Sequence, residues 1–212
     1  ATVGYYGSGS SATVSGSGSQ WNLASNNLYV GYYTDASVTV TDNAVLTSGD
    51  ITIGYGTDGH GVVNVTDGGK IYSGDVTLGS YGYPMSGTMN ISGAGSEWHV
   101  DGDITAVEDY GAATINVTDG GLLTVTDNLY LGSYGSHADD LAQMTVSGTG
   151  TIVEIGGTSY IGYGAVASLV VTNNAQFTTD ELQVGPFTEG TMTISNGAVV
   201  TATTGTEIGG SG

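Results

Sequence analysis

Leu28-Tyr29-Val30-Gly31, Ile51-Thr52-Ile53-Gly54 and Val76-Thr77-Leu78-Gly79 are three copies of one short motif. It consists of an aliphatic residue, any residue, a second aliphatic residue and a glycine. Copies recur along the 212-residue chain at intervals of 23 to 30 residues. A repeat of this length is typical of solenoid proteins, in which each unit buries its apolar face only against its neighbours. The motif therefore indicates a repeat protein rather than a globule with one central core.

We place the start of each repeat at the second aliphatic residue of the motif. The eight starts, followed by that of an incomplete ninth repeat, are Val3, Val30, Ile53, Leu78, Ala106, Leu131, Ile161, Val184 and Ile208. Each repeat holds three short segments of alternating polarity, separated by Gly, Asn, Asp or Ser, which is the pattern of half-buried strands joined by turns. We predict one all-β domain over residues 1–212, a β-solenoid of about eight coils with three strands each.

Two kinds of turn lead into the third segment and account for the uneven repeat lengths. Short repeats have a turn such as Asp67-Gly68-Gly69, and long repeats have a turn such as Ser92-Gly93-Ala94-Gly95-Ser96. Two long turns are followed by Trp21 and Trp98. We expect the extra residues to admit a larger side chain, so that the tryptophans fill a corner of the coil.

Several repeats resemble a known family. Ser92-Gly93-Ala94-Gly95-Ser96-Glu97-Trp98, Leu28-Tyr29-Val30-Gly31 and Thr191-Met192-Thr193-Ile194-Ser195-Asn196-Gly197 are similar to the β-helical repeats of bacterial autotransporter passenger domains and related surface proteins, including adhesins. The resemblance spans essentially the whole chain. It implies a right-handed, single-stranded β-helix and an extracellular location at the cell surface. Ala106-Val107 departs from the pattern, because a valine replaces the glycine of the motif.

The charge of the chain excludes several partners. One lysine, no arginine and 20 acidic residues give a formal net charge of -19. Such a surface cannot neutralise nucleic-acid phosphates or bind an anionic lipid surface. No apolar run is long enough to span a bilayer, so we expect no direct membrane insertion. Cysteine is absent, which excludes disulfides and thiolate metal sites.

Aromatic residues concentrate just after the motif glycine. Aromatic faces stack on sugars, so this set could form a glycan-binding strip; the alternative is a ladder of rings that packs one corner of the coil. The candidates for a ligand-facing role are Tyr33, Tyr55, Tyr81, Tyr134 and Tyr163.

The second segment of each repeat predicts outward-facing columns of Thr, Asn and Ser, because alternate residues of a strand point to opposite faces. Such a flat hydroxyl-rich face could bind ice or could be the solvent side of a polar sheet. The same columns contain three sequons for N-glycosylation, at Asn64, Asn90 and Asn116. Any solenoid that alternates outward Asn and Thr would generate these sequons by chance.

Acidic residues recur before the first segment and raise the question of calcium. Asp50, Asp75, Asp103 and Glu181 occupy one position of the repeat, with Asn27 and Asn128 in register. Capping of turns by Asx side chains explains this column equally well, since a calcium site needs six to eight oxygen ligands. The candidate pairs for calcium are Asp101 with Asp103 and Asp139 with Asp140. We otherwise expect no cofactor.

Catalysis is weakly supported by the sequence, and we predict that the protein is not an enzyme. Uronate lyases need a cationic group or metal at the substrate carboxylate, and Lys70 is the only lysine or arginine. Glycoside hydrolases need two carboxylates at a controlled separation in a cleft. Only residues 133–143, with His137, Asp139 and Asp140, form a segment long enough to project. We expect His60 and His99 to be surface residues without partners.

The sequence favours a structural role outside the cell, as a stalk or filament subunit. Neither Ala1-Thr2-Val3-Gly4 nor Glu207-Ile208-Gly209-Gly210 offers a cap for the terminal coil. We therefore expect either end-to-end self-association through uncapped coils or continuation into a longer chain. A glycan- or surface-binding adhesin is the alternative, and a polysaccharide-degrading β-helix enzyme is a distant third.

Overall fold

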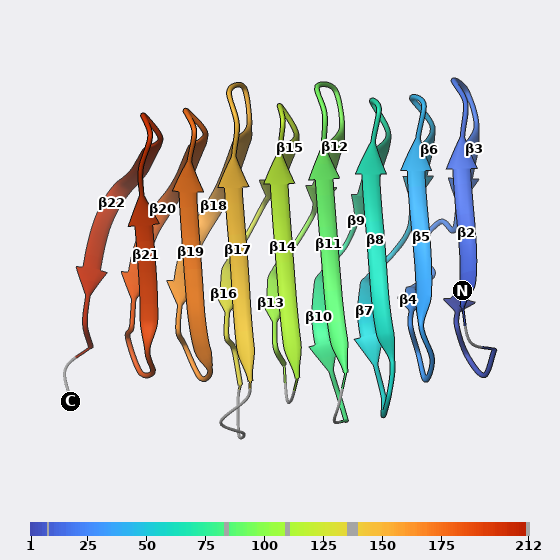
Figure 1. The fold of residues 1–212 in the computed structure, drawn as a ribbon, viewed down its shortest axis with the longest axis horizontal. Helices are drawn as coiled ribbons and strands as arrows, with labels where there is room; N and C mark the ends of the chain where they lie inside the picture. The colour runs from blue at the N-terminus through green and yellow to red at the C-terminus, as the bar shows by residue number, and fades with distance from the viewer. Residues whose placement is uncertain (8, 83–84, 109–110, 135–139, 211–212) are drawn as a thin grey trace.

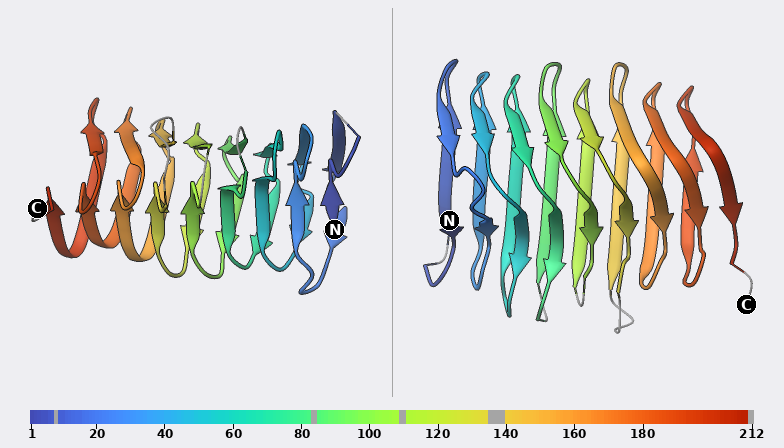
Figure 2. Two further views of the ribbon diagram at one scale, coloured as in Figure 1. Left: turned by 90° about the horizontal axis from the view of Figure 1, so that it is seen from below. Right: turned by 180° about the vertical axis from the view of Figure 1, so that it is seen from behind.

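The structure is a computed structural model that describes residues 1–7, 9–82, 85–108, 111–134 and 140–210. Over these residues the chain is all-β, with parallel strands stacked as a β-solenoid of about eight turns (Figure 1). The coils follow one another along a single axis, and the two ends of the chain lie at opposite ends of the stack (Figure 2). Among the described residues, no helix has the length and hydropathy needed to cross a membrane.

Each coil contributes three strands, as the alternating pattern predicts. The first strands are β1 (Thr2–Val3), β4 (Leu28–Val30), β7 (Ile51–Tyr55), β10 (Val76–Ser80), β13 (Ile104–Ala106) and β16 (Leu129–Leu131). The second strands are β2 (Ser10–Ser15), β5 (Ala36–Thr41), β8 (His60–Thr66), β11 (Ser86–Ser92), β14 (Ala112–Thr118), β17 (Leu141–Ser147), β19 (Val166–Thr172) and β21 (Gly190–Ile194). The third strands are β3 (Gln20–Asn22), β6 (Val45–Thr47), β9 (Lys70–Ser73), β12 (Glu97–Val100) and β15 (Leu122–Val125).

In the last three coils, the third strand continues without a break into the first strand of the next coil. These continuous strands are β18 (Ile152–Ile161), β20 (Gln176–Val184) and β22 (Val199–Ile208). They join the first and third strands into one 14-stranded sheet within the described residues, and the second strands form a separate 8-stranded sheet. The 8-stranded sheet faces the viewer in Figure 1, and the other sheet faces the viewer in the right-hand panel of Figure 2.

The pairing register confirms the repeat starts residue by residue. Along the first-strand ladder the partners run Val3, Val30, Ile53, Leu78, Ala106, Leu131, Ile161, Val184 and Ile208. Parallel pairing in this order places equivalent residues directly above one another. The ladder continues through Ala106, so the valine that follows it does not interrupt the stack.

Aliphatic side chains from both sheets meet between them and form the core. In the second strands, one inner column includes Val63, Met89 and Ile115, all of which are fully buried or nearly so. Inward-facing residues of the last coil are uncovered: the exposed fraction is 46% for Ile194, at the end of a neighbouring second-strand column, and 71% for Ile208, at the end of the first-strand ladder. Burial in this fold therefore depends on a coil above and a coil below.

The prediction that long turns admit larger side chains at a corner was wrong. Trp98 is fully buried in the inner column of the third strands, where it pairs with Ile71 and Leu123. Phe177 occupies the same column after a short turn, whereas Val153 follows a long one. The long turn extends outward instead, and its Ser96 Oγ accepts a hydrogen bond from the backbone N–H of Gly68, 3.2 Å away.

The glycine that ends the motif, which we call the Gly step, bends the chain between the first and second strands. Gly54 has a φ of +75°, and a Cβ atom there would lie 2.2 Å from the carbonyl oxygen of Ser86 in the next coil. Glycine is therefore needed both for the positive φ and for the close approach of two backbones. Val107 takes the same position with a φ of +61° and is fully buried.

Candidate functional site

The most extensive surface feature is a row of aromatic rings along the corner that follows the first strand. This corner forms the lower edge of the molecule in Figure 1. Some rings point outward from the first strands, and the others lie in the loops that lead to the second strands. We call the row the aromatic strip; its described members are Tyr5, Tyr6, Tyr29, Tyr32, Tyr33, Tyr55, Tyr81, Tyr130, Tyr134, Tyr160, Tyr163 and Phe187.

In the first four coils the rings contact one another from coil to coil. The ring centroids are 5.0 Å apart for Tyr5 and Tyr32, 4.5 Å for Tyr32 and Tyr55, and 5.9 Å for Tyr55 and Tyr81. These separations are in the range that aromatic pairs prefer. The outer members remain open to solvent, with exposed fractions of 76% for Tyr6 and 64% for Tyr81.

A second group of contacting rings follows in the later coils. Tyr130 and Tyr160 are stacked, with centroids 4.9 Å apart and planes 5° from parallel. Tyr163 lies edge-on to its neighbours, 6.3 Å from Tyr134 and 5.1 Å from Phe187. The coil between the two groups contains Tyr110, which lies outside the described residues.

All five predicted ligand-facing tyrosines belong to the strip, and each also packs against at least one other ring of the strip, as the alternative interpretation expected. Whether the strip binds a ligand stays a prediction. Sequence reasoning missed Tyr29, Tyr130 and Tyr160, which lie in the first strands and add to the strip. The signal was present in the motif itself, because the residue between its two aliphatic positions must face outward.

Crowding raises the pKa of several phenols above the ordinary value for tyrosine. For Tyr32 and Tyr33 the main cause is desolvation, followed by the nearby charges that Tyr55 and Tyr32, respectively, would carry. For Tyr130, desolvation comes first and the carboxylate of Asp103 second. For Tyr5 the main cause is a side-chain hydrogen bond with Tyr6, followed by the charge that Tyr6 would carry. Each shift disfavours the phenolate, so these rings stay neutral over a wider pH range.

The acidic column before the first strand is a ladder of backbone caps, which we call the Asx ladder. Its members are Asn27, Asp50, Asp75, Asp103 and Asn128. Each side-chain Oδ1 accepts a hydrogen bond from a backbone N–H one coil further on, namely that of Asp50 (3.1 Å), Asp75 (3.1 Å), Asp103 (2.9 Å), Asn128 (2.8 Å) and Thr158 (2.9 Å). Glu181 is in register with Thr158, as its repeat position predicts. The capping interpretation of the column is thereby confirmed.

The candidate calcium pairs are not joined into a cluster in the part of the chain that is described. There, no group of three or more His, Asp or Glu side chains could hold a metal ion. Asp101 is exposed, and Asp103 belongs to the Asx ladder. Asp140 is buried and accepts a hydrogen bond from the backbone N–H of Gly111 at 2.8 Å. Asp139 lies outside the described residues.

The three sequon asparagines stack into an amide ladder on the second-strand sheet. Nδ2 of Asn90 donates to Oδ1 of Asn64, and Nδ2 of Asn116 donates to Oδ1 of Asn90, both at 2.9 Å. The ladder is half-buried. A glycan on Asn90 or Asn116 would replace one of the two hydrogens on the nitrogen that makes this bond. Glycosylation of these residues stays a prediction.

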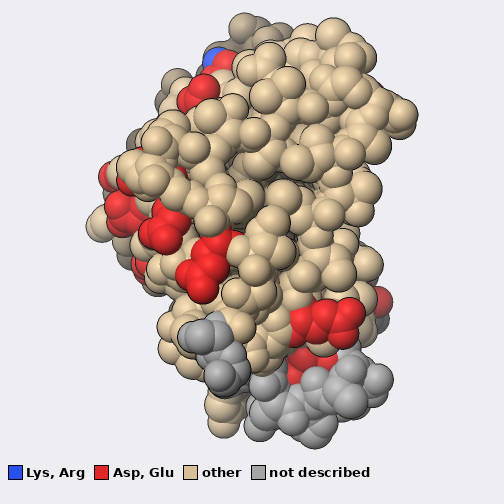
Figure 3. All heavy atoms as spheres, turned by 90° about the vertical axis from the view of Figure 1, so that its left-hand side faces the viewer, with Lys and Arg blue, Asp and Glu red and all other residues tan. Residues whose placement is uncertain are grey.

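None of the eight strands of the second-strand sheet contains Asp, Glu, Lys or Arg, although the net charge of the chain is -19. Figure 3 looks onto the C-terminal end of the stack and shows carboxylates gathered on one flank and along the bottom. The upper part of the opposite flank shows no charged residue in that view. Lys70 pairs with Glu97 of the adjacent coil, with 2.7 Å between Nζ and Oε2.

The two described histidines outside residues 133–143 have partners, contrary to the expectation from sequence. Nδ1 of His60 lies 2.8 Å from Oγ of Ser86, and Nδ1 of His99 lies 2.6 Å from Oγ1 of Thr124. Both contacts link adjacent coils. His137 lies outside the described residues, as does Asp139.

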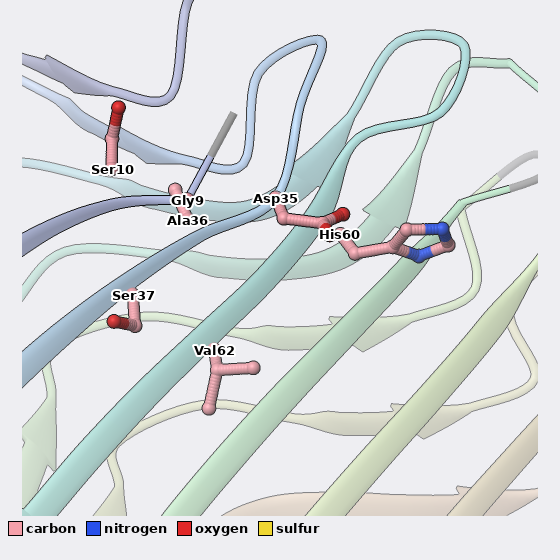
Figure 4. A pocket seen from close by; sticks show the side chains of 7 residues that line it. All are labelled: Gly9, Ser10, Asp35, Ala36, Ser37, His60 and Val62. Atoms are coloured by element: carbon pink, nitrogen blue, oxygen red, sulfur yellow. The ribbon is translucent and has the colours of Figure 1, made fainter. Parts of the chain in front are cut away.

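Two shallow hollows stand out on the described surface. One has a volume of about 380 Å³ and lies over the first three coils; it is lined by Gly9, Ser10, Asp35, Ala36, Ser37, His60 and Val62 (Figure 4). The other, of about 510 Å³, lies over the third strands, with Tyr72, His99 and Asp101 among its lining residues. Among the described residues, each hollow is lined by a single carboxylate, whereas glycoside hydrolysis requires two.

No protein-family model matches this sequence, and no curated protein or solved structure matches it either.

Proposed function

We propose that this chain is a non-enzymatic structural protein, an extracellular β-solenoid that serves as a segment of a cell-surface stalk or filament. The observation that carries the proposal is the unbroken first-strand register from Val3 to Ile208. At about 4.8 Å per coil, eight coils make a rod about 38 Å long. The resemblance of its repeats to autotransporter passenger domains supports secretion by a bacterium.

The ends of the stack support assembly with another coil of the same kind. Among the described strands, β21 pairs only with β19, and β22 pairs only with β20. Their free edges present unpaired backbone groups, and the inward-facing Ile194 and Ile208 are exposed beside them. An open edge of this kind is a template for strand addition. We propose that a further coil of the same kind covers it, supplied by a second copy or by a longer form of the same chain.

The test is the oligomeric state of the purified chain over a range of concentrations, measured by light scattering and electron microscopy. We expect end-to-end assemblies, and we expect Ile208→Lys to weaken them because it places a charge in the stacking surface. Val166→Lys is the matched control, since Val166 is 39% exposed on β19, which is covered on both edges by β17 and β21. Monomers at every concentration, or equal effects of the two variants, would count against stacking.

A second candidate, a glycan- or surface-binding adhesin, is favoured by one specific observation. Tyr6, Tyr81, Tyr134 and Phe187 are each more than 60% exposed and line one edge of the rod. Because the net charge is -19, an acidic glycan would be repelled unless a divalent cation bridged it to the chain. Binding on a glycan array that is lost in Tyr81→Ala and kept in Tyr72→Ala would support this role. Equal binding by both variants would exclude the strip as the site.

A further inference from the structure

We propose that the aromatic strip is a site of oxidative cross-linking, in which tyrosines of adjacent coils become joined by dityrosine bonds. The oxidant would be a one-electron system such as a haem peroxidase acting with hydrogen peroxide. The proposal rests on ring geometry and holds whether or not copies of the chain stack end to end.

The spacing of the rings is the first argument. Tyr32 and Tyr55 have centroids 4.5 Å apart with planes inclined by 37°, and Tyr5 and Tyr32 are 5.0 Å apart with planes inclined by 34°. These separations approach that of two rings joined by a biaryl bond. A modest rotation of side chains at the surface would bring two ortho carbons together. The parallel register holds each pair in place, so coupling needs no encounter between distant parts of the chain.

Access to an oxidant is the second argument. The strip faces solvent, with exposed fractions of 47% for Tyr5 and 37% for Tyr33. Tyr6 and Tyr33 are also stacked, 5.8 Å apart. A radical formed on one exposed ring therefore has several phenols within contact distance, on its own coil and on the next.

The chemistry balances with one peroxide per bond. Each of two phenols gives up one electron and its O–H proton, which leaves two tyrosyl radicals with spin at the ortho carbons. These carbons form the new C–C bond, and each then transfers its hydrogen to its own phenoxyl oxygen as the ring regains aromaticity. The two electrons and two protons released reduce hydrogen peroxide to two water molecules.

A covalent bond between coils would have a physical consequence for this chain in particular. Cysteine is absent, so no disulfide can link one coil to the next. A dityrosine between Tyr32 and Tyr55 would close one coil into a loop and limit the freedom of the unfolded chain, as a disulfide does. The oxidised rod should unfold at a higher temperature than the untreated one.

Tyr72 provides a matched internal control. It is 42% exposed, comparable with Tyr33, but it lies on the third strand β9. Among the described residues, the ring nearest to it is that of His99, with a centroid distance of 6.4 Å. Tyr72 is therefore open to the same oxidant without a phenol to couple with.

The experiment treats the dilute, folded chain with horseradish peroxidase and limiting hydrogen peroxide. Dityrosine fluorescence, a mass loss of two hydrogens per bond and gel mobility would be recorded for the wild type and for Tyr32→Phe, Tyr55→Phe and Tyr72→Phe. Phenylalanine keeps the ring but cannot form a phenoxyl radical. Cross-links would be located after digestion at acidic residues, because the chain has one lysine and no arginine.

We expect a monomeric product in which peptides from adjacent coils are joined, including Tyr130 with Tyr160. Tyr32→Phe should abolish the cross-links that join residue 32 to Tyr5 and Tyr55 and so lower the intramolecular yield, and Tyr72→Phe should leave the yield unchanged. In denaturant the selectivity should disappear. The proposal is overturned if dityrosine forms only between molecules, if it does not form, or if Tyr32→Phe and Tyr72→Phe reduce the yield equally.

Discussion

From the second coil to the sixth, the first strand lies between two corners, and the chain turns at them by opposite means. At the Gly step, the turn requires that no side chain be present, since a Cβ on Gly54 would lie 2.2 Å from a backbone oxygen. At the Asx ladder, the turn requires a side chain, because Oδ1 of Asp75 accepts the N–H of Asp103 at 2.9 Å. One corner is fixed by steric exclusion and the other by hydrogen bonding.

This difference explains what each corner tolerates. The Asx ladder accepts either Asn or Asp, because both supply the one oxygen that the next coil needs. The Gly step has glycine at every described coil except one, where Val107 adopts a φ of +61°. Both Asn and Asp supply the accepting oxygen at the Asx ladder, whereas few residues other than glycine fit the Gly step. Substitutions at the Gly step should therefore cost more stability than those at the Asx ladder, where the cost should depend on whether an accepting oxygen is kept.

The largest effect is expected for Gly54→Ala. The added Cβ combines an unfavourable φ of +75° with a contact of 2.2 Å to Ser86, so the second strand of the next coil must move. We expect a loss of about 3 kcal/mol in the free energy of unfolding, measured with urea. Gly18→Ala is the control, because Gly18 has a φ of +86° and an added Cβ there would contact nothing within 4 Å. It should cost only about 1 kcal/mol, and an equal loss in the two variants would show that φ alone accounts for the effect.

The same contrast decides what could be predicted from the sequence. Repeat starts and inward columns were predictable, because the Gly step and strand alternation are local signals that recur in every coil. The contents of the inner column were not, since Trp98 and Phe177 are matched to the coils above and below rather than to their own turns. The partners of His60 and His99 also lie one coil away, and placing the repeats in register would have revealed both.

At the Asx ladder, Asp75→Ala should cost less than Gly54→Ala. It removes the acceptor for the backbone N–H of Asp103 and adds no clash. Loss of such a cap is worth about 1 kcal/mol, which a urea titration resolves. Asp101→Ala, next to the ladder at an exposed position, serves as the control and should be close to neutral. A loss equal to that of Gly54→Ala would contradict the proposed division between the corners.

Asp75→Asn should raise the free energy of unfolding rather than lower it. It keeps the accepting oxygen and removes the middle one of three carboxylates, at Asp50, Asp75 and Asp103, stacked in adjacent coils. An amide nitrogen can also donate to the neighbouring carboxylate, as Nδ2 of Asn27 does to Asp50 at 3.2 Å. We expect a gain of a few tenths of a kcal/mol (about 0.3) at low ionic strength that shrinks as salt screens the repulsion. A salt-independent loss would show that the charge itself is needed.

The smallest effect belongs to the outer side of the Gly-step corner, where the aromatic strip links stability to alkaline pH. The pKa values of Tyr5, Tyr32, Tyr33 and Tyr130 are raised in the folded chain. Above about pH 10 the unfolded chain therefore loses its phenolic protons first. The stabilisation from these four groups is complete below that pH and is lost as the pH rises through their folded pKa values.

The measurement is the urea midpoint between about pH 8 and pH 12. In the wild type we expect the midpoint to stay constant and then to fall as the pH rises. The fall should be shallower in a variant with both Tyr32→Phe and Tyr130→Phe, because two of the phenols with raised pKa values are removed. Asp75→Asn should leave the slope of this decline unchanged, because the Asx ladder contributes no phenol. Identical slopes for the wild type and the double variant would mean that ring packing in the strip has no bearing on proton binding.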